Sequence, residues 1–222
     1  LTVKQFKGGQ SNPTYQLVTP KRKYVLRRKP PGKLLPSAHA VDREYKVITA
    51  LHGVGFPAPR TWCLCEDDSV IGTMFYIMDM VEGRVLWEPL LPDQDKETRW
   101  KIYSSLNETM ASLHMVDYEK IGLGDFGKPG NYFARQISRW TKQYLASETE
   151  TIPEMNKLME WLPENVPQDD STSIVHGDYR LDNTILHPTE PKVIAVLDWE
   201  LSTLGHPLGD FTYSLMQWVM PG

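Results

Sequence analysis

Cysteine is scarce in this chain, and it has neither a long apolar run nor a surplus of basic residues. The 222 residues include two cysteines, Cys63 and Cys65, with one residue between them. A structural zinc site normally takes four ligands, and a disulfide across one intervening residue is strained. We therefore expect two reduced thiols in an intracellular protein. No apolar stretch approaches the roughly 20 residues that cross a bilayer, which excludes a transmembrane chain.

The charge balance argues against a general nucleic-acid binder, which normally carries a basic face. Lys and Arg number 24 against 28 Asp and Glu, for a formal net charge of −4. Residues 1–80 hold 12 basic and 6 acidic side chains, whereas residues 81–222 hold 12 and 22. This division suits a polyanion on one side and a metal ion on the other. Scattered surface charge explains the same numbers.

Alternating segments predict an antiparallel sheet with one helix over residues 1–80. The expected strands are 1–6, 14–18, 24–27, 61–65 and 74–80. Ser37 is the predicted cap of a helix that runs to His52. Residues 81–83 form the predicted connector, or hinge.

The pattern over residues 84–222 is mainly helical. The expected helices are 93–115, 132–146, 153–162 and 207–219, and short strands are expected at 173–175, 184–186 and 193–197. Asp93 is the predicted cap of the first helix, and its expected buried stripe is Trp100, Tyr103, Leu106, Met110 and Leu113. The chain starts at Leu1 and stops at Gly222 after an apolar stretch, so we expect a fragment of a longer protein.

One eight-residue motif carries most of the chemistry. His176–Asn183 follows an apolar strand, and Asp198 ends another strand 15 residues after Asn183. This spacing is typical of a phosphoryl-transfer loop followed by a metal-binding aspartate. Asp178 is placed to orient a hydroxyl group and to accept its proton. Asn183 and Asp198 offer the oxygen ligands that Mg²⁺ prefers.

The first part of the chain supplies the groups that a phosphate needs. The turn at Gly8–Asn12 can lay backbone N–H groups over phosphates. Arg27 lies on the strand where kinases place a lysine, and Glu44 on the next helix can pair with it. Arginine is bulkier than lysine and is not interchangeable with it. Because strand side chains alternate between faces, we select Arg27 and keep Arg28 in reserve.

The motifs His176–Asn183, Leu197–Glu200 and Gly205–Asp210 resemble those of the aminoglycoside phosphotransferase and choline kinase-like family. The resemblance implies an α+β, two-lobed protein-kinase-like fold, with an antiparallel sheet and helix in one lobe and mainly helices in the other. Twelve positions separate Asp198 from Asp210, which leaves no room for a protein-kinase activation loop. This favours a small-molecule kinase.

A narrower resemblance covers nearly the whole chain. The segments Gly9–Tyr15, Val25–Gly32, Leu35–His39, Ser69–Thr73 and Leu197–Pro207 are similar to the amino-terminal kinase-like domain of acyl-CoA dehydrogenase family members 10 and 11. The resemblance implies an ATP·Mg²⁺-dependent kinase of a small-molecule hydroxyl, with 4-hydroxyacyl-CoA as the leading acceptor. It also implies a linked dehydrogenase domain that removes the phosphate, and a mitochondrial or peroxisomal location.

Carried over residue by residue, the resemblance makes Asp178 the catalytic base and Asn183 and Asp198 the Mg²⁺ ligands. Arg27, paired with Glu44, holds the nucleotide phosphates. The remaining assignments are Gly9, Ser11 and Asn12 on the phosphate-covering loop, Met80 within a hinge that meets the adenine, and Asp210 as a brace of the catalytic loop.

Two other functions remain open. A non-catalytic nucleotide-binding or scaffolding module fits, because the strand lysine is replaced and the carboxy-terminal helices of the family are shortened or absent. A metal-dependent phosphohydrolase built on Asp178, Asp182 and Asp198 also uses the carboxylates. The hydrolase leaves the Gly8–Asn12 turn and Glu44 without a role.

Overall fold

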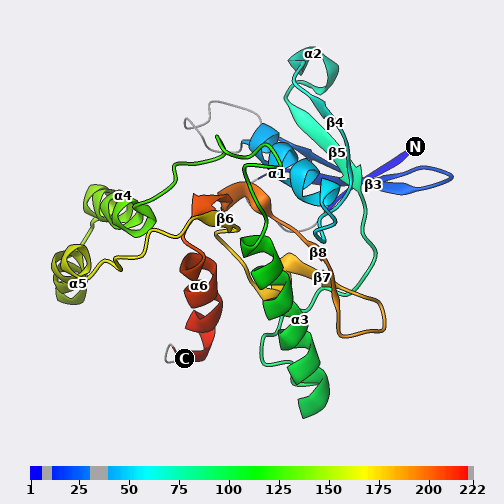
Figure 1. Ribbon diagram of the computed structural model, residues 1–222. Helices are drawn as coiled ribbons and strands as arrows, with labels where there is room; N and C mark the ends of the chain where they lie inside the picture. Colours follow the sequence, from blue (N-terminus) through cyan, green and yellow to red (C-terminus); the bar gives the residue numbers. More distant parts are fainter. Residues whose placement is uncertain (7–11, 31–39, 220–222) are drawn as a thin grey trace.

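A five-stranded antiparallel sheet forms the first part of the chain in the computed structural model, which describes residues 1–6, 12–30 and 40–219. The strand order is β1-β2-β3-β5-β4 (Figure 1). The strands are β1 Thr2–Gln5, β2 Thr14–Val18, β3 Lys23–Arg28, β4 Thr61–Cys65 and β5 Phe75–Asp79. All five strands predicted from alternation are present, with ends that differ by at most one residue.

Helix α1 (Val41–Gly53) packs against this sheet (Figure 1). Its buried residues are Val41, Glu44, Val47, Ile48 and Leu51. Glu44 is the one charged group in that buried row. A charged side chain is rarely buried unless it is paired, so Glu44 is expected to have a partner. The helix begins later than predicted, with Ala40 at the N-cap position and no side-chain cap. The expected cap, Ser37, lies outside the described residues.

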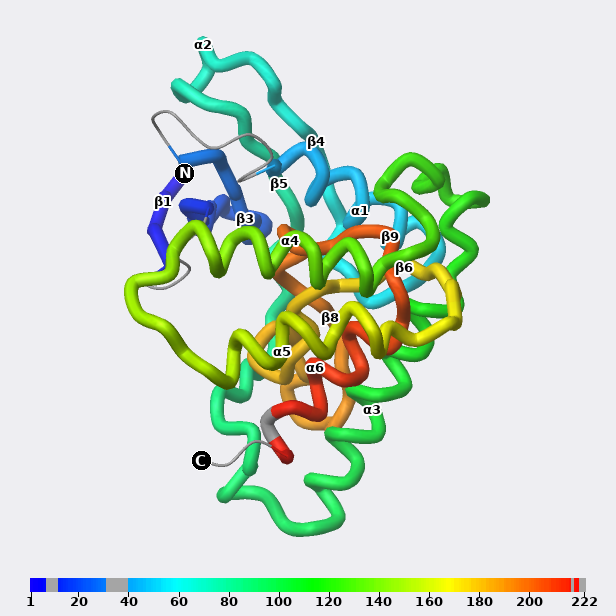
Figure 2. Tube along the Cα trace, turned by 90° about the vertical axis from the view of Figure 1, so that its left-hand side faces the viewer, coloured from blue at the N-terminus to red at the C-terminus, as the bar shows by residue number. Residues whose placement is uncertain are grey.

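The second part of the chain contains most of the helices and two small sheets. Strand β6 (Ser173–Val175) pairs with β9 (Thr203–Gly205), and β7 (Thr184–Leu186) pairs with β8 (Val193–Val196). The helices are α3 Lys96–His114, α4 Tyr132–Ser147, α5 Pro153–Glu164 and α6 Leu208–Val219, with short 3₁₀ turns η1 Leu181–Asn183 and η2 Trp199–Leu201. Figure 2 shows α4 and α5 lying side by side.

The start and the buried face of α3 correct the sequence-based expectation. Asp95, not Asp93, caps this helix, because its carboxylate accepts a hydrogen bond from the Thr98 backbone N–H at 2.8 Å. Trp100 is 74% exposed, so it does not belong to the buried stripe. Ile102 is buried in its place, next to Leu106, Met110 and Leu113. Tyr103 is half-buried and donates to the Pro89 carbonyl oxygen.

One hydrophobic cluster joins the two parts of the chain. It includes Val47 and Leu51 of α1 together with Leu106 of α3 and Trp199 of η2. The rings of Phe56 and Trp199 meet edge to face at 5.8 Å. The turn that follows β8 is therefore fixed against α1. This packing positions Asp198, which precedes η2, opposite the sheet.

Two further features concern the class of protein. Cys63 and Cys65 are free thiols on β4, as expected. The helices in the described part of the chain are all too short or too polar to cross a bilayer. Helix α2 (Asp68–Ile71) is a short element that the sequence pattern did not predict.

Candidate active site

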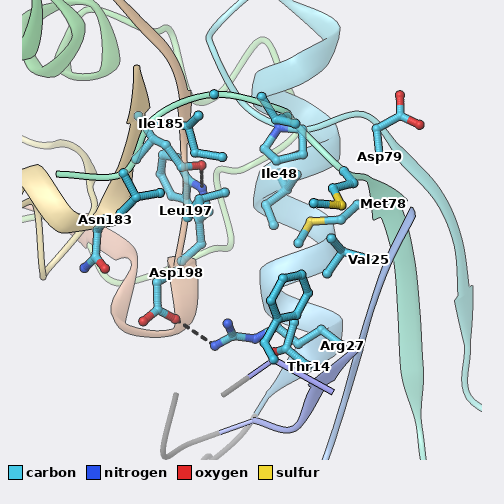
Figure 3. A pocket seen from close by; sticks show the side chains of 18 of the residues that line it. Thr14, Val25, Arg27, Ile48, Met78, Asp79, Asn183, Ile185, Leu197 and Asp198 are labelled. Atoms are coloured by element: carbon cyan, nitrogen blue, oxygen red, sulfur yellow. Dashed lines mark hydrogen bonds and ion pairs between the residues drawn. The ribbon is translucent and has the colours of Figure 1, made fainter. Parts of the chain in front are cut away.

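A cavity of about 680 Å³ lies between the sheet and the segment that follows β6. Apolar side chains cover one end of it, from Val25, Ile48, Met78 and Ile185. The other end is polar, with Arg27, Asn183 and Asp198. Figure 3 shows Arg27 reaching across this end toward Asp198, with Asn183 on the same side as Asp198. An apolar pocket with a few convergent polar groups is the usual form of a small-molecule site.

Strand register places Arg27 in the cavity. In the β3–β5 pair, Arg27 lies opposite Tyr76 and Val25 lies opposite Met78. Directly opposed residues project from the same face of a sheet, so these four side chains share the face toward α1. Arg28 projects the other way, and its Nε donates to the Lys29 carbonyl oxygen at 3.3 Å. The structure therefore puts Arg27 at the site and leaves the reserve candidate Arg28 outside it.

Arg27 contacts three carboxylates at once. Its Nη2 lies 2.7 Å from Oδ1 of Asp198 and 3.2 Å from Oε2 of Glu200. Its Nε lies 2.9 Å from Oε2 of Glu44, which is an ion-pair distance without the angle of a hydrogen bond. Burial by itself lowers the pKa of Arg27, but the carboxylates of Glu44 and Asp198 outweigh it and raise that pKa. The cation is therefore permanent.

Glu44 is held by neutral donors as well as by Arg27. Asn12 Nδ2 donates to its Oε1 at 2.8 Å, and the Tyr76 hydroxyl donates to its Oε2 at 3.1 Å. Burial raises the pKa of Glu44 to about 7, against the opposing effect of Arg27. Its carboxylate is 1% exposed, so removing either Glu44 or Arg27 leaves the other without its ion-pair partner.

Asn12 is the one residue of the turn Gly8–Asn12 that lies within the described residues. Gly9 and Ser11, which we expect to cover phosphates, lie outside the described residues. Asn12 is described and is 3% exposed. The structure places its side chain against Glu44, where it supports the Arg27–Glu44 pair.

The loop His176–Asn183 is held in place by Asp210. The carboxylate of Asp210 accepts the backbone N–H groups of His176 and Gly177, both at 2.8 Å. Gly177 has a φ of +84°, and a Cβ there would lie 2.8 Å from the Leu201 carbonyl oxygen, so this position requires glycine. His176 is buried and contacts the Leu197 carbonyl oxygen at 2.8 Å. Asp210 thus braces the loop, as predicted.

Asp178 and Asn183 are joined directly. Asn183 Nδ2 lies 2.9 Å from both the carbonyl oxygen and Oδ2 of Asp178. Because the amide nitrogen donates to Asp178, the amide oxygen is the atom of Asn183 that could bind a cation. Asp198 sits in the left-handed region at φ +63°, a conformation that Asp tolerates better than most residues. Its Oδ1 contacts Arg27.

The oxygen donors of Asn183 and Asp198 fit Mg²⁺, which is bound in proteins through one or two side chains together with substrate phosphates. No cluster of three or more His, Cys, Asp or Glu side chains suited to a metal occurs within the described ranges. The three-carboxylate centre of a phosphohydrolase is therefore not assembled there. Asp182 is instead paired with Arg180 at 3.1 Å.

The connector lies against β7. Met80 borders the cavity, and its backbone N–H donates to the Lys23 carbonyl oxygen at 3.3 Å. A Cβ on Gly83 would collide with the Leu186 carbonyl oxygen, so only glycine allows the connector to pass so close. Arg84 then exchanges both backbone hydrogen bonds with Leu186 at 2.8 Å.

Three site residues are not found by sequence reasoning. Tyr76 and Glu200 contact the Arg27 cluster, and Arg180 contacts Asp178 at 3.2 Å. Two of them carry a signal in the sequence, because Arg180 is a cation inside the eight-residue motif and Glu200 ends the Leu197–Glu200 motif. Tyr76 and Glu200 depend on strand register and on a turn that brings distant segments together.

Comparison with known proteins decides the family. Residues 2–222 match the model of the phosphotransferase enzyme family. The chain belongs to this family. It is 48% identical to acyl-CoA dehydrogenase family member 10 of Mus musculus over 98% of its length, and 49% identical to family member 11 of Rattus norvegicus over 100%. The chain spans 20% and 28% of those proteins.

Solved structures show the same fold. A crystal structure of a Ralstonia eutropha JMP134 protein, named after the aminoglycoside phosphotransferases, is 59% identical with a TM-score of 0.90. The match covers 100% of this phosphotransferase-family chain and 65% of that one. An aminoglycoside phosphotransferase complex with AMP-PNP and hygromycin B is 17% identical, with a TM-score of 0.68 over 94% and 70% of the two chains. The predicted α+β protein-kinase-like fold is confirmed.

Proposed function

We propose that this chain transfers the terminal phosphoryl group of ATP to a hydroxyl group of a small molecule. The observation that carries the proposal is the ion-pair cluster of Arg27 with Glu44 and Asp198 across the cavity. Asn183, which is joined to Asp178, lines the same cavity. Membership of the phosphotransferase enzyme family supports the reaction class.

Arg27 and the connector would bind the nucleotide. Arg27 projects from β3 into the polar end of the cavity, and Glu44 keeps its guanidinium in place for phosphate oxygens. The apolar end, with Val25, Ile48 and Met78, suits a purine ring, and the backbone near Met80 would meet its edge. On this proposal residues 1–80 form the nucleotide-binding lobe, 81–83 the hinge and 84–222 the catalytic lobe.

Asn183 and Asp198 would hold Mg²⁺ through their oxygen atoms, and Mg²⁺ when bound neutralises charge on the phosphates. Asp178 would orient the acceptor hydroxyl group and accept its proton. The acceptor oxygen forms the new bond to phosphorus, while the bond to the β-phosphate oxygen breaks and leaves its electron pair on ADP. No covalent enzyme intermediate is needed for this transfer.

The acceptor is proposed from the relatives. Both curated relatives carry acyl-CoA dehydrogenase names, and this chain matches only a fraction of each. We infer that the acceptor is a hydroxyacyl-CoA, with 4-hydroxyacyl-CoA first to be tried, and that a linked dehydrogenase domain consumes the phosphorylated product. A mitochondrial or peroxisomal location belongs to the same proposal.

Asp178→Asn tests the reaction. With ATP, Mg²⁺ and 4-hydroxyacyl-CoA, we expect kcat to fall by about 10²- to 10⁴-fold, because the general base is lost. Nucleotide affinity should change little, since Asp178 is not placed to bind phosphate in this scheme. An Asp178→Asn variant with full kcat would show that the mechanism is wrong.

A non-catalytic nucleotide-binding module is the second candidate. It is favoured by one observation, that Arg27 contacts Oδ1 of Asp198, an oxygen atom that we propose for Mg²⁺. Such a module would bind ATP in a manner that depends on Arg27 but would phosphorylate no hydroxyl acceptor. Equal ATP turnover by wild type and Asp178→Asn, at background rate, is the result that favours it.

A further inference from the structure

Arg180 is fixed at the edge of the cavity by its two neighbours in the chain. Tyr179 is fully buried and Leu181 is 3% exposed. The Tyr179 hydroxyl donates to the Leu106 carbonyl oxygen at 2.8 Å, which ties the loop to α3. The backbone of Arg180 is therefore anchored on both sides, while its side chain is 46% exposed and borders the cavity.

The guanidinium of Arg180 bridges two carboxylates of the catalytic loop. Its Nε lies 3.2 Å from Oδ1 of Asp178, and its Nη2 lies 3.1 Å from Oδ2 of Asp182. Ion pairs that are this exposed contribute little free energy, so the guanidinium can exchange these partners for a stronger one. In the arrangement that the structure shows, Arg180 covers one oxygen of the proposed base.

Carboxylates outnumber cations among the described residues around the cavity, and Arg180 is the second of the two cations. Among the described lining residues, the carboxylates are Asp79, Glu82, Asp182 and Asp198, and the cations are Arg27 and Arg180. Arg27 comes from β3, whereas Arg180 comes from the loop before η1. On the proposed function, a triphosphate held at Arg27 would place its terminal phosphate near the carboxylates of Asp182 and Asp198.

We propose that Arg180 is a further catalytic residue, which binds the terminal phosphate of a nucleoside triphosphate and the phosphoryl group during its transfer. This rests on the proposed phosphotransferase function. The planar guanidinium offers two parallel N–H donors to phosphate oxygens. When Arg180 turns to the phosphate, Oδ1 of Asp178 is uncovered for the acceptor hydroxyl group, so the base becomes available only when a phosphoryl donor is present.

The proposal makes a prediction about binding that does not depend on turnover. Only the terminal phosphate contacts Arg180, so its loss should weaken the binding of Mg²⁺·AMP-PNP and leave that of Mg²⁺·ADP nearly unchanged. We expect Arg180→Met to lower the ratio of the two affinities by about 10- to 100-fold, in line with a charge-assisted hydrogen bond. Arg180→Lys should restore part of the ratio, since it keeps the charge but not the fork.

Calorimetric titration of wild type, both Arg180 variants and Arg139→Met with each nucleotide tests this. Arg139 is an exposed arginine of α4, and its substitution should leave both affinities unchanged. A folding defect would weaken both nucleotides together, so the ratio separates it from a lost contact. An unchanged ratio in Arg180→Met overturns the inference alone. Failure of wild type to bind either nucleotide overturns the proposed function as well.

A kinetic measurement gives a second readout. In Arg180→Met, we expect kcat to fall by about 10²- to 10³-fold, as when one donor to developing charge is removed. The Michaelis constant for the hydroxyacyl-CoA acceptor should stay within about twofold, since the acceptor does not contact Arg180. A raised Michaelis constant with an unchanged kcat would assign Arg180 to acceptor binding and contradict the proposal.

Discussion

Nη2 of Arg27 lies 2.7 Å from Oδ1 of Asp198, although 171 positions separate the two residues in the chain. The contact joins the five-stranded sheet to the turn after β8, across the cavity in which we place ATP (Figure 3). Glu44 holds the same guanidinium from α1. An arginine can span these carboxylates because its guanidinium presents several donors in one plane, which a lysine does not.

Arg27→Met should destabilise the protein strongly. It leaves Glu44 buried without its cation, and we expect the free energy of unfolding at pH 8 to fall by about 3 kcal/mol. Arg27→Lys should cause a smaller loss, because it keeps the charge. Urea unfolding measures both, with Arg28→Met as the matched control. Arg28 lies on the opposite face of β3, so its loss should change stability by no more than about 0.5 kcal/mol. Equal effects at positions 27 and 28 would contradict this account.

Glu44 should make stability depend on pH. Its pKa is raised from its ordinary value of 4.5 to about 7 in the folded protein, mainly by burial. The native state therefore binds more protons than the unfolded state between these values, and stability from Glu44 falls as the pH rises from about 4.5 to about 7. Relative to Glu44→Gln, wild type should lose stability across this window and run parallel above it. Urea unfolding from pH 5 to 8 checks this, and parallel curves throughout would refute it.

Much of the fold is predictable because it rests on local patterns. The strands β3 and β5 and the loop before η1 are predicted near their observed positions, since alternation and motif spacing are properties of short segments. Helix starts are predicted less well. Asp93 and Asp95 are both good caps by type, and only the contact with the Thr98 N–H shows which one is used. Strand β9 (Thr203–Gly205) is not predicted, because Leu204 is its one large apolar residue, whereas β6 and β7, equally short, each contain two adjacent large apolar residues.

The site is predictable where chain order carries it and not where tertiary contacts do. Arg27 and Glu44 follow from their order along the chain. Glu200 reaches Arg27 only through the turn after Asp198, and Tyr76 reaches Glu44 only through the register of β3 and β5. The expectation for Trp100 is wrong because Ile102, not Trp100, continues the buried face of Leu106, Met110 and Leu113 toward the start of α3. These are outcomes of packing that no single segment specifies.

Asp210 should be essential for the shape of the loop His176–Asn183. It is 1% exposed and accepts two backbone N–H groups and a contact from His114 Nε2 at 2.9 Å. Asp210→Ala leaves these buried donors without an acceptor, so we expect a loss of about 2 to 4 kcal/mol. Thermal and urea unfolding measure this. Asp93→Ala removes an exposed carboxylate and serves as the control, with an effect of about 0.5 kcal/mol or less. A mild effect of Asp210→Ala would mean that other contacts hold the loop.

The most direct test of the central claim is the stabilisation of wild type and Asp198→Ala by ATP, measured by thermal or chemical unfolding with and without Mg²⁺. Each protein is compared with its own nucleotide-free form, which cancels the strain of alanine at a left-handed position. At an ATP concentration about 100 times the dissociation constant, wild type with Mg²⁺ should gain about 2.7 kcal/mol. We predict that Asp198→Ala loses the Mg²⁺-dependent part of this gain. Equal Mg²⁺-dependent stabilisation of both proteins, or no effect of ATP on wild type, would contradict the account.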